Sequence, residues 1–204
     1  MKLLIKVPKD NIKIFQKKKY KSTNIRCEIC GKNKSEVFQN IGKTGNEPGL
    51  YGYLPISICS YCGHKYLSPR YPDSFYREFF KKEYGKSLFK KTNPTKKYLK
   101  FQKERGERVY SFLNKFLKEQ NNSKLLDHGT ATGLALVPWL KNNWDCFGID
   151  PHKPSVEYAQ NQGLNVKYGY GEKLPYKSNN FEVILSLGSF EHAYDVNKTF
   201  KEFN

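Results

Sequence analysis

From residue 123 to residue 204, short apolar runs alternate with segments of helical periodicity. The apolar runs, each short enough for a buried strand, are Leu125-Leu126, 146–149, 165–168 and 181–187. The segments that predict helices are 134–142, 154–162 and 189–203. Strands that alternate with helices form parallel sheets. The sequence therefore predicts an α/β fold with a doubly wound parallel sheet and helices on both of its faces.

The residues before this alternation are organised differently. Residues 26–70 carry four cysteines without helical periodicity, which predicts a small loop-and-hairpin module. Aromatic spacing predicts a helix from Asp73 to about Tyr84, and Asn93-Pro94 predicts the start of a second helix. The apolar face of the second helix is predicted at Val109, Phe112, Leu113, Phe116 and Leu117. The domains we expect are 1–70, a basic segment with the cysteine module, 71–122, a helical linker or cap, and 123–204, the sheet domain.

The four cysteines of the module come as two copies of the pattern C-x-x-C-G. They are Cys27, Cys30, Cys59 and Cys62. Two such pairs supply the four thiolates of a tetrahedral zinc site, which is closed and therefore structural. Disulfides or a redox pair are the alternatives, and His64 is a further candidate ligand. Cys146 lies in a predicted buried strand, where we expect a small core side chain.

A glycine-rich turn follows the first predicted strand, from Asp127 to Gly133. Its spacing does not fit the G-x-G-x-x-G of nicotinamide binding, and no P-loop Lys-Ser/Thr follows it. It fits D-x-G-x-G-x-G, except that Ala131 replaces the middle glycine and is expected to crowd a ligand. Asp150 ends the second predicted strand, where a carboxylate can accept hydrogen bonds from both hydroxyls of a ribose.

Two later motifs complete this pattern. They are Gly171-Glu172-Lys173-Leu174-Pro175 before the fourth predicted strand and Glu191-His192 after it. In this order the chain resembles the class I S-adenosylmethionine-dependent methyltransferases, and among them the bacterial type with an N-terminal zinc-binding segment. The resemblance covers about residues 26–200. It implies a Rossmann-like sheet and S-adenosylmethionine as cofactor, with structural zinc in the front module.

The resemblance also implies roles for individual residues. The residues that would contact the cofactor are Asp127, Gly129, Thr130, Gly133, Asp150, Pro151, Gly171, Glu172 and Leu187. Among them Asp150 would bind the ribose and Gly171-Glu172 would border the adenine. His192 is the candidate base for a hydroxyl acceptor. The alternatives are that Asp127 and Glu172 only cap loops and that His192 only packs at the start of a helix.

The charge of the chain is divided unequally. Residues 1–126 hold 29 basic and 10 acidic side chains, whereas residues 127–204 hold 7 and 9. A cationic half invites a nucleic-acid interpretation. However, only 5 of the 36 basic residues are arginine, the side chain that supplies bidentate base and phosphate contacts. We therefore favour a solvated lysine-rich surface and keep RNA binding as the alternative.

The function predicted from these features is methyl transfer to a small-molecule or saccharide acceptor. The alternatives are an RNA methyltransferase and a non-catalytic, truncated methyltransferase-like protein. The predicted sheet stops after its fourth strand, so we expect a C-terminally truncated chain or a partner chain that completes the sheet. No apolar run reaches the roughly 20 residues that span a bilayer, and no signal peptide is evident, so we expect a cytoplasmic protein.

Overall fold

The computed structural model describes residues 21–40, 55–82, 89–90, 93–117 and 123–204. The chain forms two compact units, Met1–Phe79 and Phe80–Asn204, which we call the cysteine unit and the sheet unit. Residues 1–20 of the predicted basic segment lie outside the described residues. The second predicted helix was expected to continue to residue 121, but it ends at Leu113, and residues 118–122 lie outside the described residues.

The cysteine unit contains a three-stranded antiparallel sheet. Its strands are β1 (Ser35–Asn40), β2 (Pro55–Cys59) and β3 (Lys65–Leu67), in the order β1-β2-β3. Ser57 and Cys59 alternate with half-buried residues along β2, so one face of this strand points to the small core around Cys27, Cys59 and Tyr66. The predicted hairpin module is thus present, and the helix expected from Asp73 forms as α2 (Asp73–Lys82).

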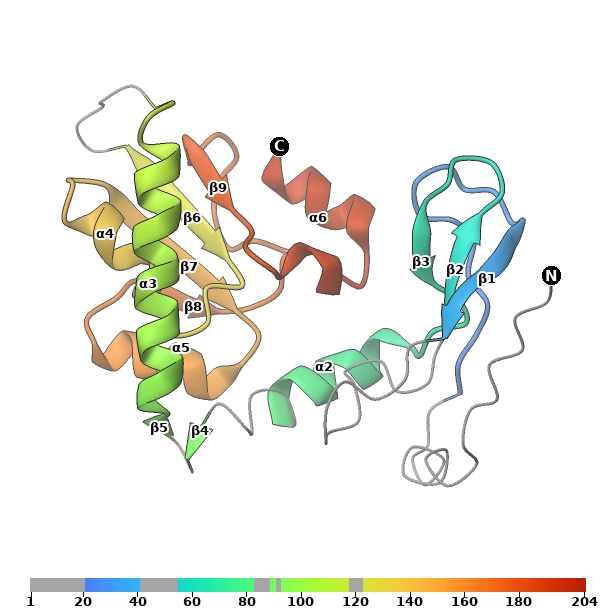
Figure 1. Cartoon of the computed structure of the whole chain (residues 1–204), viewed down its shortest axis with the longest axis horizontal. Coiled ribbons are helices and arrows are strands. Elements are labelled where there is room, and N and C mark those ends of the chain that lie inside the picture. The colour runs from blue at the N-terminus through green and yellow to red at the C-terminus, as the bar shows by residue number, and fades with distance from the viewer. Residues whose placement is uncertain (1–20, 41–54, 83–88, 91–92, 118–122) are drawn as a thin grey trace. The chain divides into compact units, whose positions relative to one another are not determined.

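The sheet unit is built on four parallel strands (Figure 1). They are β6 (Lys124–His128), β7 (Asp145–Asp150), β8 (Val166–Tyr168) and β9 (Val183–Leu185). Their order is β8-β7-β6-β9, so the chain first moves outward on one side of β6 and then crosses to the other. This arrangement confirms the predicted doubly wound α/β fold, and β6 lies at the point where the strand order reverses.

The helices of the sheet unit lie around these strands (Figure 1). They are α3 (Lys96–Leu113), α4 (Val137–Leu140), α5 (Lys153–Asn161) and α6 (Val196–Phe203), with 3-10 turns η2 (Leu134–Leu136) and η3 (Phe190–His192). The predicted helix at 189–203 is therefore interrupted. Its second part begins at Asp195, whose side chain accepts a hydrogen bond from the Lys198 N–H. The main core is formed by Leu125, Leu136, Trp139, Trp144, Cys146, Val156, Ala159, Val166 and Leu185.

The start of α3 differs from the prediction. Asn93–Pro94 form the short strand β5, which pairs with β4 (Phe89–Lys90), so Asn93 does not cap the helix. The N-cap is Thr95, whose hydroxyl accepts a hydrogen bond of 3.3 Å from the Tyr98 N–H. A threonine hydroxyl satisfies the first unpaired amides of a helix as asparagine would. The helix therefore begins two residues later than predicted, after an extended dipeptide that suits proline.

The predicted apolar face is confirmed in part. Val109, Leu113 and Leu117 pack, partly buried, against the main core, and Phe112 and Phe116 do not. Phe112 and Phe116 are 61% and 71% exposed, whereas Gln102 and Gly106 are buried. A β-carbon on Gly106 would lie 2.6 Å from Ala135 Cα, so the backbone of α3 meets the glycine-turn segment directly at this glycine. This close approach holds the Gly106 side of the helix inward. Phe112 lies on the exposed side of α3, and Phe116 follows the end of the helix at Leu113.

Candidate cofactor pocket and cysteine cluster

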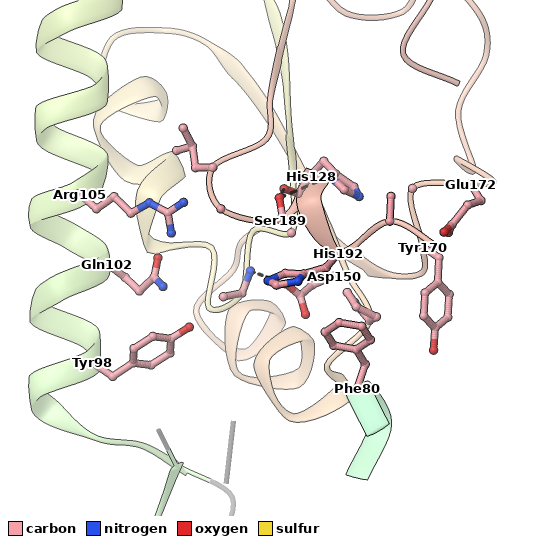
Figure 2. A pocket seen from close by; sticks show the side chains of 17 residues that line it. Phe80, Tyr98, Gln102, Arg105, His128, Asp150, Tyr170, Glu172, Ser189 and His192 are labelled. Carbon is pink, nitrogen blue, oxygen red and sulfur yellow. Dashed lines mark hydrogen bonds between the residues drawn. The ribbon is translucent and has the colours of Figure 1, made fainter. Parts of the chain in front are cut away.

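A pocket lies at the carboxyl ends of β6, β7 and β9 (Figure 2). In an open parallel sheet this edge, next to the reversal of strand order, is where ligands bind. The segments that follow β6, β7, β8 and β9 line it, together with one face of α3. The residues predicted from sequence that line it are Gly129, Asp150, Pro151, Gly171, Glu172, Leu187 and His192.

Asp150 ends β7 at the base of the pocket. Its Oδ2 accepts a hydrogen bond of 2.7 Å from the Ala131 N–H, and its Oδ1 accepts one of 2.7 Å from the His152 N–H. Burial raises the pKa of Asp150 to about 6, while these two backbone amides act in the opposite direction. Each carboxylate oxygen keeps a second lone pair for a ligand, so this residue both anchors the glycine turn and offers acceptors at the pocket.

The glycine turn places its members on two different sides. Gly129 and Ala131 line the pocket, and both have left-handed backbone conformations, with φ of +73° and +52°. Thr130 and Gly133 face away from it. Thr130 packs against Gly148, and a β-carbon on Gly133 would meet the side chain of Leu164 at 2.8 Å. Only part of the predicted turn therefore reaches the pocket directly. The rest sets the path of the turn.

Asp127 lies beneath the turn and does not line the pocket. Its side chain is only 2% exposed, and burial raises its pKa to about 7, against the effect of the Arg105 charge. A buried carboxyl with this pKa changes its charge near neutral pH, close to where a ligand would bind.

Gly171 and Glu172, in the segment after β8, also line the pocket. The Glu172 Oε1 atom accepts hydrogen bonds from the N–H groups of Tyr194, at 2.8 Å, and Asp195, at 3.4 Å. This contact joins the loop before β9 to the loop before α6. It is the loop-capping geometry that the sequence left as an alternative for Glu172.

His192 belongs to the 3-10 turn η3 and also lines the pocket. Its ring centroid lies 6.0 Å from that of Phe80, and burial lowers its pKa, against the effect of Glu191. A histidine with a lowered pKa is neutral at pH 7 and can accept a proton. Its position thus allows the role of base that the sequence suggested.

Several pocket residues were missed by the sequence reasoning, among them His128, Ser189 and three residues of α3. Tyr98, Gln102 and Arg105 project from one face of α3 toward the pocket, as Figure 2 shows. The Arg105 Nη2 atom lies 3.7 Å from the position that a β-carbon on Gly188 would take, so a cation stands beside the segment after β9. Their spacing in the sequence, four residues and then three, could have indicated that these polar side chains share one face of a helix. That face lies next to Gly106.

The four cysteines of the cysteine unit converge. The Sγ atoms of Cys27, Cys30, Cys59 and Cys62 all lie within 4.8 Å of one another. Cys27 Sγ and Cys62 Sγ are 3.6 Å apart, as are Cys30 Sγ and Cys59 Sγ. Thiolates placed about 2.3 Å from a tetrahedral zinc would be separated by about 3.8 Å, whereas a disulfide needs about 2.05 Å. The cluster is therefore suited to a metal ion and is not disulfide-bonded.

Each cysteine pair is closed by the glycine that follows it. The Gly31 N–H donates to the Cys27 carbonyl at 2.8 Å, and the Gly63 N–H donates to the Cys59 carbonyl at 3.0 Å. Both glycines have positive φ, +70° and +73°, a conformation that glycine adopts without steric cost. Backbone N–H groups of Tyr61 and Cys62 lower the pKa of Cys59 to about 6, whereas burial and the three other thiols raise the pKa of Cys62 to about 12. Without a metal ion, the close sulfurs therefore favour a thiolate at Cys59 and a neutral thiol at Cys62.

Cys146 is separate from this cluster. It is a buried member of the sheet-unit core, and burial raises its pKa to about 12. It therefore has the role of a small apolar side chain that the sequence suggested.

The sequence was then compared with known proteins. Residues 126–204 match the family described as "Methyltransferase domain". The chain is 33% identical over 89 residues to the uncharacterized methyltransferase YcgJ of Bacillus subtilis. This match covers 39% of this chain and 34% of YcgJ. The chain thus spans about a third of the length of this relative.

Solved structures with a similar arrangement were also found. The YcgJ crystal structure from Bacillus subtilis is 26% identical, with a TM-score of 0.41, and the match covers 48% of this chain and 44% of that one. A Haloferax volcanii complex that contains the Trm112 methyltransferase activator gives 21% identity and a TM-score of 0.45, over 51% of this chain and 48% of that one.

The family match begins within β6 and includes the whole of the parallel sheet after it. None of the helices that the structure describes is long and apolar enough to cross a membrane. The match, the doubly wound sheet and the glycine turn with Asp150 agree with one another. The match of residues 126–204 to the methyltransferase domain family, together with the relative from Bacillus subtilis, therefore supports a class I S-adenosylmethionine-dependent methyltransferase.

Proposed function

We propose that this protein binds S-adenosylmethionine in the pocket of the sheet unit and transfers its methyl group to a small-molecule or saccharide acceptor. One observation carries the proposal. The glycine turn and the Asp150 carboxylate meet at the carboxyl edge of the sheet, inside the segment that matches the methyltransferase family.

The chemical groups of the pocket suit this cofactor. The Asp150 carboxylate offers acceptors for ribose hydroxyls, and the Arg105 guanidinium offers a partner for the methionine carboxylate. Leu187 and Pro151 supply apolar contacts. A β-carbon on Gly188 would meet other protein atoms only at 3.7 Å, so its backbone is open to close approach by a ligand.

The cofactor supplies an activated methyl group on a sulfonium, and the protein mainly has to align the acceptor with it. If the acceptor is a hydroxyl, its proton must leave as the new bond to carbon forms. We assign His192 to receive that proton, since it lines the pocket and its pKa is lowered by burial. S-adenosylhomocysteine and the methylated acceptor are then the products.

For the cysteine cluster we propose one structural zinc ion, held by Cys27, Cys30, Cys59 and Cys62. The sulfur separations of 3.6 Å support this, because they are close to the edge of a zinc–thiolate tetrahedron. Four thiolates leave no open coordination position, so this ion would stabilise the cysteine unit and take no part in methyl transfer.

Calorimetric titration with S-adenosylhomocysteine tests the cofactor site. We expect wild type to bind and Asp150→Ala to bind at least about tenfold more weakly, because charged hydrogen-bond acceptors are worth about 1.5–3 kcal/mol. Asp145→Ala is the matched control, since Asp145 is an exposed aspartate at the opposite end of the same strand. It should bind like wild type.

The results also separate the alternatives. Absence of binding by wild type would contradict both enzyme functions and favour a non-catalytic protein. An RNA acceptor predicts RNA binding by the lysine-rich half that weakens steeply with salt. Fluorescence anisotropy with a labelled single-stranded RNA at low and high salt measures this, and salt-insensitive or absent binding favours the small-molecule or saccharide acceptor.

A further inference from the structure

The pocket contains a buried histidine that the proposed chemistry does not use. His128 is the last residue of β6, is only 8% exposed, and lines the pocket. Figure 2 shows it beside Ser189, which belongs to the segment after β9. Burial lowers the pKa of His128, against the effect of Glu172, so the neutral ring is favoured.

A closed ring of hydrogen bonds joins His128 to two serines. The Ser189 Oγ atom lies 2.5 Å from the His128 carbonyl oxygen and 3.0 Å from Ser186 Oγ, which in turn lies 3.0 Å from His128 Nδ1. The carbonyl can only accept, so the Ser189 hydroxyl donates to it. When the Ser186 hydroxyl donates to Ser189 Oγ, both serine oxygens are left as acceptors for Nδ1, Ser186 Oγ at 3.0 Å and Ser189 Oγ at 3.4 Å. This arrangement satisfies every contact of the ring and favours the histidine proton on Nδ1.

The same histidine contacts the opposite wall of the pocket through its other ring nitrogen. A β-carbon on Gly171 would lie 2.4 Å from His128 Nε2, so the ring fits closely against the Gly171 backbone. The ring of Phe203, from α6, packs edge-on against His128 with centroids 5.2 Å apart. The histidine is therefore fixed from several sides, and its Nδ1–H has a defined direction.

The serines hold the segment after β9 against the glycine turn. A β-carbon on Gly129 would lie 2.3 Å from Ser189 Cβ, so the Ser189 side chain packs directly against the Gly129 backbone. Leu187 and Gly188, between the two serines, line the pocket. Loss of the ring would leave buried polar groups unpaired and release these two residues from the pocket wall.

We propose that His128 is a positioning residue of the cofactor site, acting through Nδ1–H, Ser186 and Ser189 to fix Leu187 and Gly188 beside the glycine turn. The proposal rests on the proposed function only in naming the ligand. The hydrogen-bond ring itself is a property of the protein and can be measured without any ligand.

Nitrogen-15 spectra of the histidine rings test the ring directly. The chain has four histidines, so the His128 signal is the one that disappears in His128→Asn. We expect the neutral Nδ1–H tautomer in wild type at about pH 7.5, since free histidine titrates near pH 6.5. We also expect its Nδ1 shift to change in Ser186→Ala. The Nε2–H tautomer would overturn the proposal.

Two substitutions then separate the two ring nitrogens. Asparagine places its amide nitrogen near the position of Nδ1, whereas glutamine places its amide near the position of Nε2. We expect His128→Gln to bind S-adenosylhomocysteine about tenfold more weakly, and His128→Asn to stay within about threefold of wild type, because one hydrogen bond is worth about 0.5–1.5 kcal/mol. Equal affinities of the two variants contradict a role for Nδ1.

A second buried pair provides the control. Ser155 is 2% exposed and its Oγ atom lies 2.7 Å from His152 Nδ1, but it does not line the pocket. Ser155→Ala should bind the ligand like wild type, whereas Ser189→Ala should bind about three- to tenfold more weakly. A similar loss in both variants would indicate a general loss of stability and would overturn the positioning role.

Hydrogen exchange keeps this inference separate from the proposed function. In the absence of ligand, the amides of Leu187 and Gly188 should exchange faster in His128→Gln than in His128→Asn. If wild type binds no S-adenosylhomocysteine but this difference is found, the proposed cofactor is wrong and the positioning of the pocket wall is supported. Equal exchange in the two variants overturns the inference whether or not the ligand binds.

Discussion

Two buried aspartates dominate the site at the scale of single residues. Asp150 is satisfied by two backbone amides, and burial still raises its pKa to about 6. Asp127 lies deeper under the glycine turn, and burial raises its pKa to about 7. Ionisation of either carboxyl group in the folded protein is therefore unfavourable and lowers the stability of the fold. Such a cost is typical of groups placed for binding or catalysis and not for stability.

Asp127→Asn tests this cost. The pKa of Asp127 rises from 3.8 in the reference state to about 7, so between these values the native state binds more protons than the unfolded state. Stability from this group is therefore lost as the pH rises through that window. We expect the asparagine variant to gain stability relative to wild type between pH 5 and pH 8, by more than about 1 kcal/mol.

Urea denaturation followed by tryptophan fluorescence measures this difference. Both tryptophans of the chain, Trp139 and Trp144, are buried in the sheet-unit core, so the signal reports on that unit. Asp145→Asn, an exposed aspartate on β7, is the control and should show no comparable pH trend. A pH-independent difference for Asp127→Asn would show that its ionisation is not costly.

At the scale of elements, helix α3 contributes both to the core of the sheet unit and to its pocket. Its buried Gly106 lets the helix backbone approach Ala135, and the same rotation brings Arg105 and Gln102 to the pocket. Phe112 near the end of α3 and Phe116 just after it are exposed, with ring centroids 5.4 Å apart. One glycine therefore decides both the packing of the helix and which of its side chains reach the pocket.

Gly106→Ala should destabilise the sheet unit. The new β-carbon would lie 2.6 Å from Ala135 Cα and 2.7 Å from its carbonyl oxygen, and these are backbone atoms that cannot rotate away. Overpacking of this kind costs about 1–3 kcal/mol, which exceeds the gain of about 1 kcal/mol in helix propensity. Tryptophan fluorescence in urea measures the shift.

Ser111→Ala is the control for α3, because Ser111 is exposed on the same helix. It should leave the denaturation midpoint unchanged or raise it slightly, since alanine favours helices. An equal or higher midpoint for Gly106→Ala would contradict the close helix contact.

At the scale of the whole molecule, the chain has two units with separate cores. One is the small cluster around Cys27, Cys59 and Tyr66, and the other surrounds the parallel sheet. So small an apolar cluster provides little hydrophobic stabilisation, and units of this size commonly need a metal. Metal binding should therefore be required for folding in the cysteine unit only.

Cys30→Ser tests this division. We expect wild type to contain about one zinc per chain and the variant to lose it, since a structural site needs all four thiolates. The cysteine unit should then become sensitive to protease, whereas the tryptophan fluorescence of the sheet unit should keep its urea midpoint. Elemental analysis and limited proteolysis measure the two effects.

Ser60→Ala is the matched control, since Ser60 is an exposed residue between Cys59 and Cys62. It should retain zinc and protease resistance. If Cys30→Ser lowers the urea midpoint of the tryptophan signal as well, the two units are not independent.

The sequence alone determined the features that depend on local spacing. Two C-x-x-C-G pairs predicted the cysteine cluster, because a turn of fixed length brings two thiols together. The alternation of apolar runs and helices predicted the doubly wound sheet, and with it the meeting of the glycine turn and Asp150 at one edge. These predictions succeeded because strand ends in a parallel sheet converge by geometry.

Only the tertiary structure decided how α3 is turned and how His128 is bonded. Periodicity gives the spacing of a helical face, but the buried face depends on what the helix packs against, and here that is Ala135 at Gly106. The ring that joins His128 to Ser186 and Ser189 spans 58 residues or more of sequence. Such contacts form only when β6 and β9 pair, so no local sequence pattern could predict them.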